Sequence, residues 1–233
     1  MPAPIAVAID APDLHAARAL AAAVAPHVAV LKLGLEFFCA EGPAGIEAVR
    51  GDYPIGLFLD LKLHDIPATV AGAARAAARL QPDYLTVHAS GGTAMISAAA
   101  EAAPEVAIAA VTILTSMSAD DLRAIGMEGE PSEAVVRLAT LAVMAGARAL
   151  VCSPQEVRAV RHAVGPAITL ITPGVRLVGG ERNDQARVAS PQQALADGAD
   201  LLVIGRPITA AADPGGVAAD LAAKLALARN SAI

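Results

Sequence analysis

Three ionisable side chains with the types and spacing for acid–base chemistry lie in one stretch, residues 56–67. The stretch begins as an apolar run typical of a strand and then presents Asp60, Lys62 and Asp65. Because side chains two apart on a strand point the same way, Asp60 and Lys62 should share a face. Burying a pair of charged side chains after an apolar run costs free energy unless the charges pair with each other or face a ligand. The alternative is a solvated strand end, with Asp65 capping the helix that begins near Pro67.

Lys32 and Asp10 add two charges at the ends of earlier apolar runs. Lys32 lies between two leucines, where an unpaired ammonium group would be costly, so we expect a carboxylate beside it. Carboxylates flanking Lys62 favour its charged form, which suits a proton donor and disfavours a Schiff-base lysine. Asp10 is either a helix cap before Pro12 or a ligand of a polar group such as a sugar hydroxyl.

Two segments near the carboxyl terminus suggest a phosphate site. Gly205-Arg206 follows the last apolar run, and Arg206 offers bidentate donors beside backbone amides. Residues 172–185 form a long, polar, Gly-rich segment, which indicates a lid over a phosphorylated substrate. His88 ends another apolar run and is either structural or catalytic.

The composition excludes several classes of protein. The chain has 233 residues, of which 55% are hydrophobic and 17% charged, as in a globular protein. The net charge of −6 argues against nucleic-acid binding. No apolar run is long enough for a membrane helix, and the first residues lack the features of a signal peptide, so we expect a cytoplasmic protein without membrane contact.

No cofactor is expected from the motifs. Cys39 and Cys152 lack a metal-ligand spacing and are interpreted as free thiols used in packing. No His, Asp or Glu cluster has clear metal spacing, and neither a GxGxxG nor a Walker pattern is present.

Eight apolar runs of strand length alternate with Ala-rich helical segments. Such alternation predicts a parallel sheet covered by helices, and eight units predict one closed (β/α)8 TIM barrel spanning residues 1–233; an open doubly wound sheet is the alternative. The expected strands are 5–10, 28–33, 55–61, 84–88, 106–114, 149–152, 167–171 and 201–205. The expected helices are 14–24, 42–50, 66–80, 93–102, 132–145, one beginning at Ser153-Pro154, 191–197 and 216–228.

In such a barrel the polar strand ends meet on one rim, where barrel active sites are built. Residues 60–67 match the D-x-K-x-x-D-I-P signature, and the chain resembles the orotidine 5′-phosphate decarboxylase family over nearly its whole length. The matching segments, in order, are 7–10, 31–34, 60–67, 85–89, 114–117, 172–176, 184–187 and 204–207.

The resemblance implies a metal-free and cofactor-free homodimeric TIM barrel that decarboxylates orotidine 5′-monophosphate to UMP in pyrimidine synthesis. Lys62 would protonate the carbanion at C6, and Asp60 would lie beside the departing carboxylate. Lys32 would hold Asp60 and the ribose. Asp10 would bind the ribose.

The resemblance also implies an active site shared across the dimer and further substrate contacts. Asp65 would reach the neighbouring subunit's site, with Ile66 and Thr69 beside it. Ser116, with Thr115, would read the pyrimidine. Arg206, with Gly205, would bind the phosphate, and Arg176 would belong to the phosphate-side loop. Gln185 would bridge the phosphate and the base in the closed lid, and Pro173 would be a further substrate contact.

Two other hypotheses remain open. A sugar-phosphate decarboxylase or synthase of the same barrel type would use Mg²⁺ and resembles a pattern with Glu at the place of Lys32, so Lys32 favours the metal-free enzyme. A non-catalytic sensor of phosphorylated ligands would keep Gly205-Arg206 and lose the charged residues around Lys62.

Overall fold

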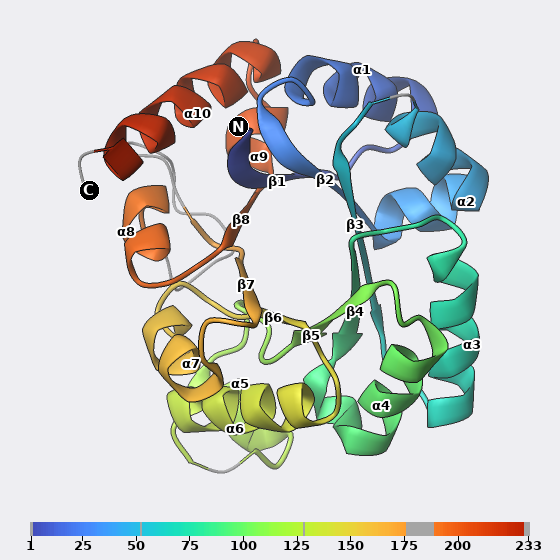
Figure 1. The fold of residues 1–233 in the computed structure, drawn as a ribbon, viewed down its shortest axis with the longest axis vertical. Coiled ribbons are helices and arrows are strands. Elements are labelled where there is room, and N and C mark those ends of the chain that lie inside the picture. The colour runs from blue at the N-terminus through green and yellow to red at the C-terminus, as the bar shows by residue number, and fades with distance from the viewer. Residues whose placement is uncertain (1, 52, 128, 176–188, 231–233) are drawn as a thin grey trace.

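The protein is a closed barrel of eight parallel strands, described from a computed structural model (Figure 1). The structure describes residues 2–51, 53–127, 129–175 and 189–230. Each strand pairs with the next in the sequence, and β1 also pairs with β8, with Ile5 opposite Leu202. This last pairing closes the sheet, so the predicted TIM barrel is confirmed and the open sheet is excluded.

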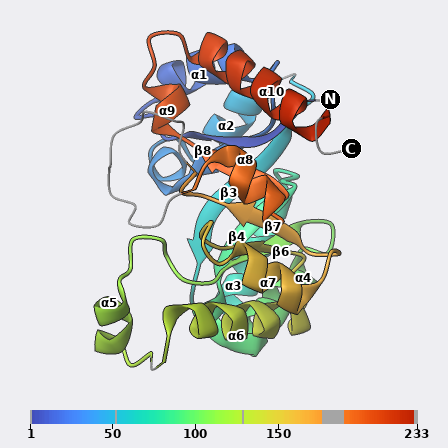
Figure 2. The ribbon, with the colours of Figure 1, turned by 90° about the vertical axis from the view of Figure 1, so that its left-hand side faces the viewer.

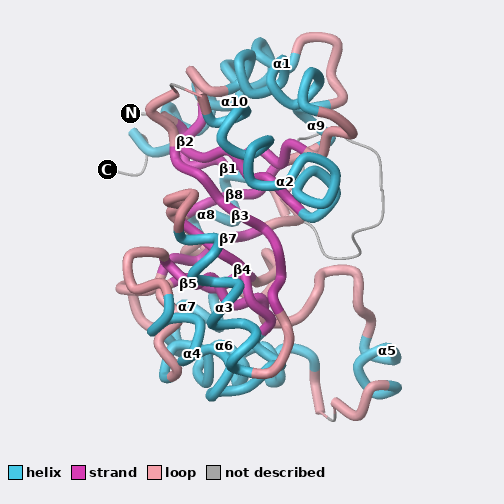
Figure 3. The backbone as a smooth tube through the Cα atoms, turned by 90° about the vertical axis from the view of Figure 1, so that its right-hand side faces the viewer, coloured by secondary structure: helices cyan, strands magenta, loops and turns pink. Residues whose placement is uncertain are grey.

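The strands are short and almost wholly buried, because helices cover the outside of the barrel (Figures 1 and 3). The strands are β1 (Ala3–Ile9), β2 (Val28–Gly34), β3 (Gly56–Leu63), β4 (Tyr84–His88), β5 (Ala107–Val111), β6 (Ala149–Val151), β7 (Thr169–Thr172) and β8 (Leu201–Ile204).

The helices lie in a ring around the strands, with the amino-terminal and carboxyl-terminal helices α1 and α10 side by side. The helices are α1 (Leu14–Val24), α2 (Leu35–Arg50), α3 (Pro67–Ala78), α4 (Gly92–Ala102), α5 (Ala119–Ala124), α6 (Pro131–Met144), α7 (Val157–Val164), α8 (Pro191–Ala196), α9 (Arg206–Thr209) and α10 (Pro214–Asn230), with the 3-10 turn η1 at Ala89–Gly91.

Two apolar clusters follow from the alternation of side chains along each strand. The larger cluster lies between the strands and the helices. The smaller cluster lies inside the barrel and includes three alanines. Its members are Ala6, Val30, Phe58, Ala109, Ala149, Ile171 and Leu201.

Several predicted boundaries are wrong, each for a local reason. The helix predicted from residue 42 begins at Leu35, because the chain continues helically across a kink at Gly42, where φ is +64°. The strand predicted over 106–114 ends at Val111. The helix predicted from Ser153-Pro154 begins at Val157, after a turn in which the Ser153 N–H donates to the Glu156 carboxylate (3.0 Å).

The short helices α5 and α9 were not predicted. Neither has a long apolar face, and α5 stands away from the rest of the barrel (Figures 2 and 3). Within the described part of the chain, no helix has the length and apolar character needed to cross a membrane.

Candidate active site

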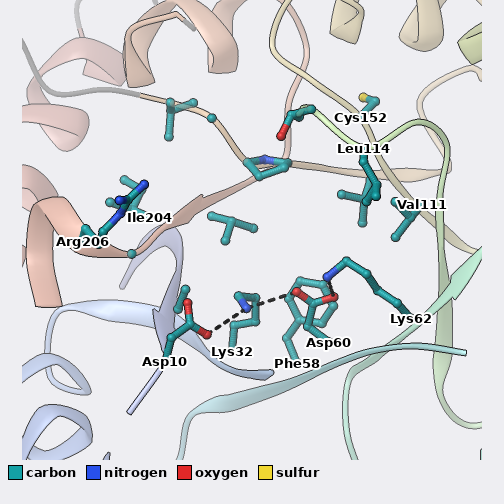
Figure 4. Close-up of a pocket in the computed structure, with 18 of the residues that line it drawn as sticks. Asp10, Lys32, Phe58, Asp60, Lys62, Val111, Leu114, Cys152, Ile204 and Arg206 are labelled. Carbon is teal, nitrogen blue, oxygen red and sulfur yellow. Dashed lines mark hydrogen bonds and ion pairs between the residues drawn. The ribbon is translucent and has the colours of Figure 1, made fainter. Parts of the chain in front are cut away.

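A row of four charged side chains crosses the mouth of the barrel at the carboxyl ends of the first three strands (Figure 4). Lys32 Nζ lies 3.6 Å from Asp10 Oδ1 and 3.1 Å from Asp60 Oδ2. Lys62 Nζ lies 2.8 Å from Asp60 Oδ1. The register of the strands places Ala8 beside Lys32, and Lys32 beside Phe58, so that alternating positions of neighbouring strands point into the same space.

Asp60 is the centre of this row, with a side chain only 14% exposed and a lysine on each oxygen. Burial alone would raise the pKa of Asp60, but the ammonium groups of Lys32 and Lys62 outweigh burial and hold the pKa below its ordinary value. Lys32 is also buried, with its side chain 9% exposed, and the expectation of a carboxylate beside it is confirmed. The row therefore presents fixed, mutually compensated charges to the barrel mouth.

The backbone of Lys62 departs from an ideal strand. Its φ of +49° lies in the left-handed region, and the pairing of β3 with β4 shifts register between Leu59 and Leu63. The side chains of Asp60 and Lys62 do meet, as predicted, but through this irregular backbone. Thr86 contacts both residues, because its Oγ1 accepts from the Lys62 N–H (2.7 Å) and donates to Asp60 Oδ1 (3.1 Å).

A cavity of about 620 Å³ lies above the charged row. Apolar side chains from β5, β6 and β8 form one wall of the cavity, among them Val111, Val151 and Val203. Arg206, at the start of α9, lies across the cavity from Lys62 (Figure 4). The cavity thus has the Arg206 guanidinium group at one end and the Lys62 ammonium group at the other, with the charged row along its floor and an apolar wall.

Eight of the predicted site residues line this cavity, although they come from six different strands or the loops after them. The residues that line the cavity as predicted are Asp10, Lys32, Asp60, Lys62, Thr115, Pro173, Gly205 and Arg206. Asp10 does not cap α1, because the N-cap is Asp13, whose side chain accepts from the Ala16 N–H. The helix-cap interpretation of Asp10 is therefore wrong.

Four predicted residues are exposed and do not line the cavity of this subunit. They are Asp65, Ile66, Thr69 and Ser116. The prediction of Asp65 as the cap of α3 is wrong, because Ile66 occupies the N-cap and Pro67 the first helical position. The Asp65 carboxylate instead accepts from the adjacent Ile66 N–H (2.6 Å). Ile66 is an apolar side chain that is 66% exposed.

Arg176 and Gln185 lie outside the described residues. The segment that contains them leaves the barrel at Val175 and returns at Ala189, and these two residues pair as an isolated bridge. Val175 itself lines the cavity, so both ends of the segment are at the barrel mouth.

His88 was left open between a structural and a catalytic role, and it lies near the charged row without lining the cavity. Its ring centroid is 5.4 Å from that of His64, whose side chain is exposed. Burial lowers the pKa of His88, and the nearby His64 and Lys62 lower it further, while Asp60 opposes them. His88 therefore favours the neutral form in the folded protein.

The cysteines differ in environment. Cys152 is buried in the lining of the cavity, where burial raises the pKa of its thiol to about 12, and this makes it a poor nucleophile. Cys39 is exposed on α2, so its predicted packing role is wrong. Among the residues that the structure describes, no three His, Cys, Asp or Glu side chains are grouped as metal ligands.

The fold and the cavity together define the class of this protein: a (β/α)8 barrel with an acid–base row at the ends of β1 to β3 and an arginine after β8. The model of the orotidine 5′-phosphate decarboxylase / HUMPS family matches residues 3–221. The chain belongs to this family, as the sequence motifs predicted.

Relatives of known name are similar over nearly their full length. An orotidine 5′-phosphate decarboxylase of Thermobifida fusca is 66% identical over 225 residues, covering 97% of both chains. One of Frankia casuarinae is 57% identical over 248 residues, covering 99% of this chain and 90% of the relative. The crystal structure of the Lactobacillus acidophilus orotidine 5′-phosphate decarboxylase superposes with a TM-score of 0.83 at 32% identity, covering 96% of this chain and 98% of that chain.

Proposed function

We propose that Lys62 is the proton donor, and Asp60 the neighbour of the departing carboxylate, in the decarboxylation of orotidine 5′-monophosphate (OMP) to UMP. This conversion, a step of pyrimidine synthesis, is the reaction of this protein. The observation that carries the mechanism is the continuous ion-paired row from Asp10 to Lys62, which faces the cavity.

The cavity suggests how the substrate is oriented. We place the phosphate at Arg206 and Gly205, because a guanidinium group and backbone amides bind phosphate well. The ribose would then lie over Asp10 and Lys32, and the base between the apolar wall and Lys62. Thr115 and Ser116 would contact the base, with Pro173, Arg176 and Gln185 on the phosphate side.

Bond breaking leaves an electron pair on a carbon atom that has no obvious acceptor. The C6–carboxylate bond breaks, CO₂ leaves, and the pair stays on C6. The Lys62 ammonium group, fixed by Asp60, stabilises that charge as it develops and then transfers one proton to C6 to give UMP. The Asp60 carboxylate repels the substrate carboxylate, and this repulsion ends when CO₂ departs. Binding at the distant phosphate supplies free energy for holding the reacting group there.

The active site would be completed by a second subunit. Asp65, Ile66 and Thr69 are exposed at the junction of β3 and α3, directly after Lys62 in the chain. We place them in the neighbouring subunit's site of a homodimer. A metal-free reaction and a cytoplasmic location remain predictions from the sequence.

The test is to add OMP to the purified protein and follow its ultraviolet absorbance, with UMP identified by chromatography. We expect stoichiometric UMP and CO₂, with turnover unchanged by EDTA. Absence of UMP would overturn the proposal. The family model also covers HUMPS proteins, so loss of activity in EDTA and recovery with Mg²⁺ would instead favour the sugar-phosphate enzyme.

A sensor without catalysis is less consistent with the site. Such a protein needs only the phosphate end of the cavity, whereas Lys32, Asp60 and Lys62 keep a compact and paired arrangement at the other end. Ligand binding without turnover in the same assay would favour the sensor.

A further inference from the structure

Thr86 lies in the middle of β4 and is fully buried, with an exposed fraction of 0%. Its neighbours along the strand, Leu85 and Val87, are also fully buried and apolar. A threonine hydroxyl has one donor and can accept two hydrogen bonds. Here the donor goes to Asp60 Oδ1 (3.1 Å), and one acceptor position is used by the Lys62 N–H (2.7 Å).

The hydrogen bond from the Lys62 N–H to Thr86 takes the place of a strand-to-strand hydrogen bond that the sheet does not form here. Leu59 pairs with Leu85, and Leu63 pairs with Val87, so three residues of β3 face only one residue of β4. Such a bulge leaves N–H groups without a partner in the ladder. The Thr86 side chain accepts from one of these groups, at the residue whose φ is +49°.

The left-handed backbone at Lys62 requires support. A residue with a Cβ atom in this region is less stable by roughly 1–2 kcal/mol than in an ordinary conformation, and it persists only where its surroundings hold it. A strand that relaxed to negative φ at this residue would direct the side chain elsewhere. The Thr86 hydroxyl is a buried group that bonds directly to this backbone.

The bond to Asp60 ends on the same oxygen that Lys62 Nζ contacts. Asp60 Oδ1 accepts from Thr86 Oγ1 (3.1 Å) and from Lys62 Nζ (2.8 Å). The Thr86 hydroxyl therefore contacts Lys62 in two ways. It bonds directly to the Lys62 backbone, and it reaches the Lys62 ammonium group through the Asp60 carboxylate. Thr86 does not line the cavity, so it acts on the reaction through these two residues.

We propose that Thr86 is a positioning residue, which holds Lys62 in its left-handed conformation and fixes Asp60 Oδ1 toward the Lys62 ammonium group. This inference rests on the proposed function of Lys62 as the proton donor. A purely structural threonine at this buried position could be replaced by valine without loss of turnover, because valine has the same shape and a higher strand propensity.

The test compares Thr86→Val, which removes the hydroxyl, with Thr86→Ser, which keeps it. We expect Thr86→Val to lower kcat at least about tenfold, with KM for OMP and Kd for UMP within about threefold, because misplaced catalytic groups slow the chemical step more than binding. We expect Thr86→Ser to stay within about threefold of wild type in kcat. Thr86→Ala serves as the hydroxyl-free variant if the valine protein does not fold.

The matched control is Thr112→Val. Thr112 is 4% exposed, and its hydroxyl donates to the Val151 carbonyl (3.0 Å), which the Thr112 N–H also contacts (3.1 Å). This variant loses a buried threonine hydroxyl without touching the charged row, so its kcat should remain near wild type. A kcat for Thr86→Val within twofold of this control would overturn the proposal.

A crystal structure of Thr86→Val tests the same inference without turnover. We expect Lys62 to leave positive φ or its Nζ to move away from Asp60 Oδ1, compared with 2.8 Å here. An unchanged Lys62 would overturn the positioning role whether or not the wild type converts OMP. A wild type that forms no UMP would overturn the proposed function instead, so the two failures are distinguishable.

Discussion

Asp60 depends on its two lysines because its carboxylate is largely removed from water. Its lowered pKa means that the folded state favours the ionised form. This contribution to stability is present above the ordinary pKa of about 3.9 and is lost as pH falls through the lower folded value. Asp60 therefore stays charged at neutral pH, as its place beside the Lys62 ammonium group requires.

Replacing Lys62 with alanine should separate catalysis from binding. We expect kcat to fall by about 10²–10⁴-fold or more, because general acid catalysis and charge stabilisation are lost together. UMP binding should change little, because Arg206 lies across the cavity from Lys62. Stopped assays for UMP and calorimetric titration measure the two effects.

The matched control for this variant is Lys224→Ala. Lys224 forms an exposed pair with Asp220 on α10 and should be dispensable for turnover. Turnover of Lys62→Ala close to that of Lys224→Ala would contradict the assignment of the proton donor.

His88 should make stability depend on pH. Its lowered pKa means that the unfolded chain binds more protons than the folded protein between the folded value and the ordinary value of about 6.5. Stability should therefore fall as pH decreases below about 6.5, and His88→Gln should reduce this slope. Thermal unfolding between pH 5 and 7 measures it, and the exposed His15→Gln serves as control. Equal slopes in wild type and His88→Gln would contradict the prediction.

At the scale of elements, the strand ends were predictable because their alternation and parallel order place them on one rim. Asp10, Lys32, Asp60 and Lys62 follow from these two facts, and the structure brings them together. The contacts of Thr86 were not predictable, because they depend on a local shift in the pairing register of β3 and β4. No residue type in the sequence indicates this shift. Sequence spacing also left open that Asp65 caps the following helix, whereas the N-cap of α3 is one residue later, at Ile66.

A second interaction between elements lies at the other end of the barrel. Arg161 of α7 donates to the carbonyls of Gly165 (2.7 Å), Ile168 (2.8 Å) and Gly198 (2.8 Å) and pairs with Asp200. It thus joins α7 to the segments that lead into β7 and β8. Hydrogen bonds from a charged donor in a partly buried place stabilise more than exposed ones.

Arg161→Ala should lower the free energy of unfolding by about 2–4 kcal/mol, because several carbonyls lose their charged donor together. Arg158→Ala is the matched control on the same helix: its side chain is 79% exposed and pairs only with Asp197 among the contacts described, so about 0–1 kcal/mol is expected. Urea unfolding of both variants measures the difference in the free energy of unfolding. Similar losses in the two variants would show that Arg161 is not the main contact between α7 and the segments that lead into β7 and β8.

At the scale of the whole molecule, the barrel brings together most of the predicted site residues on one chain, and the proposed dimer would supply the rest. The cavity at the barrel mouth is lined by eight of the predicted residues. The proposed dimer concerns three residues that are exposed on the single chain, namely Asp65, Ile66 and Thr69. Sequence patterns within one chain do not reveal which surface a second chain would cover, so this part came only from the family resemblance.

Mixing two inactive variants tests whether sites are shared in a dimer. Asp65→Ala and Lys62→Ala should each be nearly inactive alone. In a mixed dimer one site combines Lys62 of one subunit with Asp65 of the other, so random exchange in equal amounts should restore about a quarter of wild-type activity. As control, Asp65→Ala mixed with the double variant Asp65→Ala/Lys62→Ala forms no complete site and should remain inactive. If differently tagged subunits purify together and activity still does not return, Asp65 serves its own subunit, and the shared site is wrong.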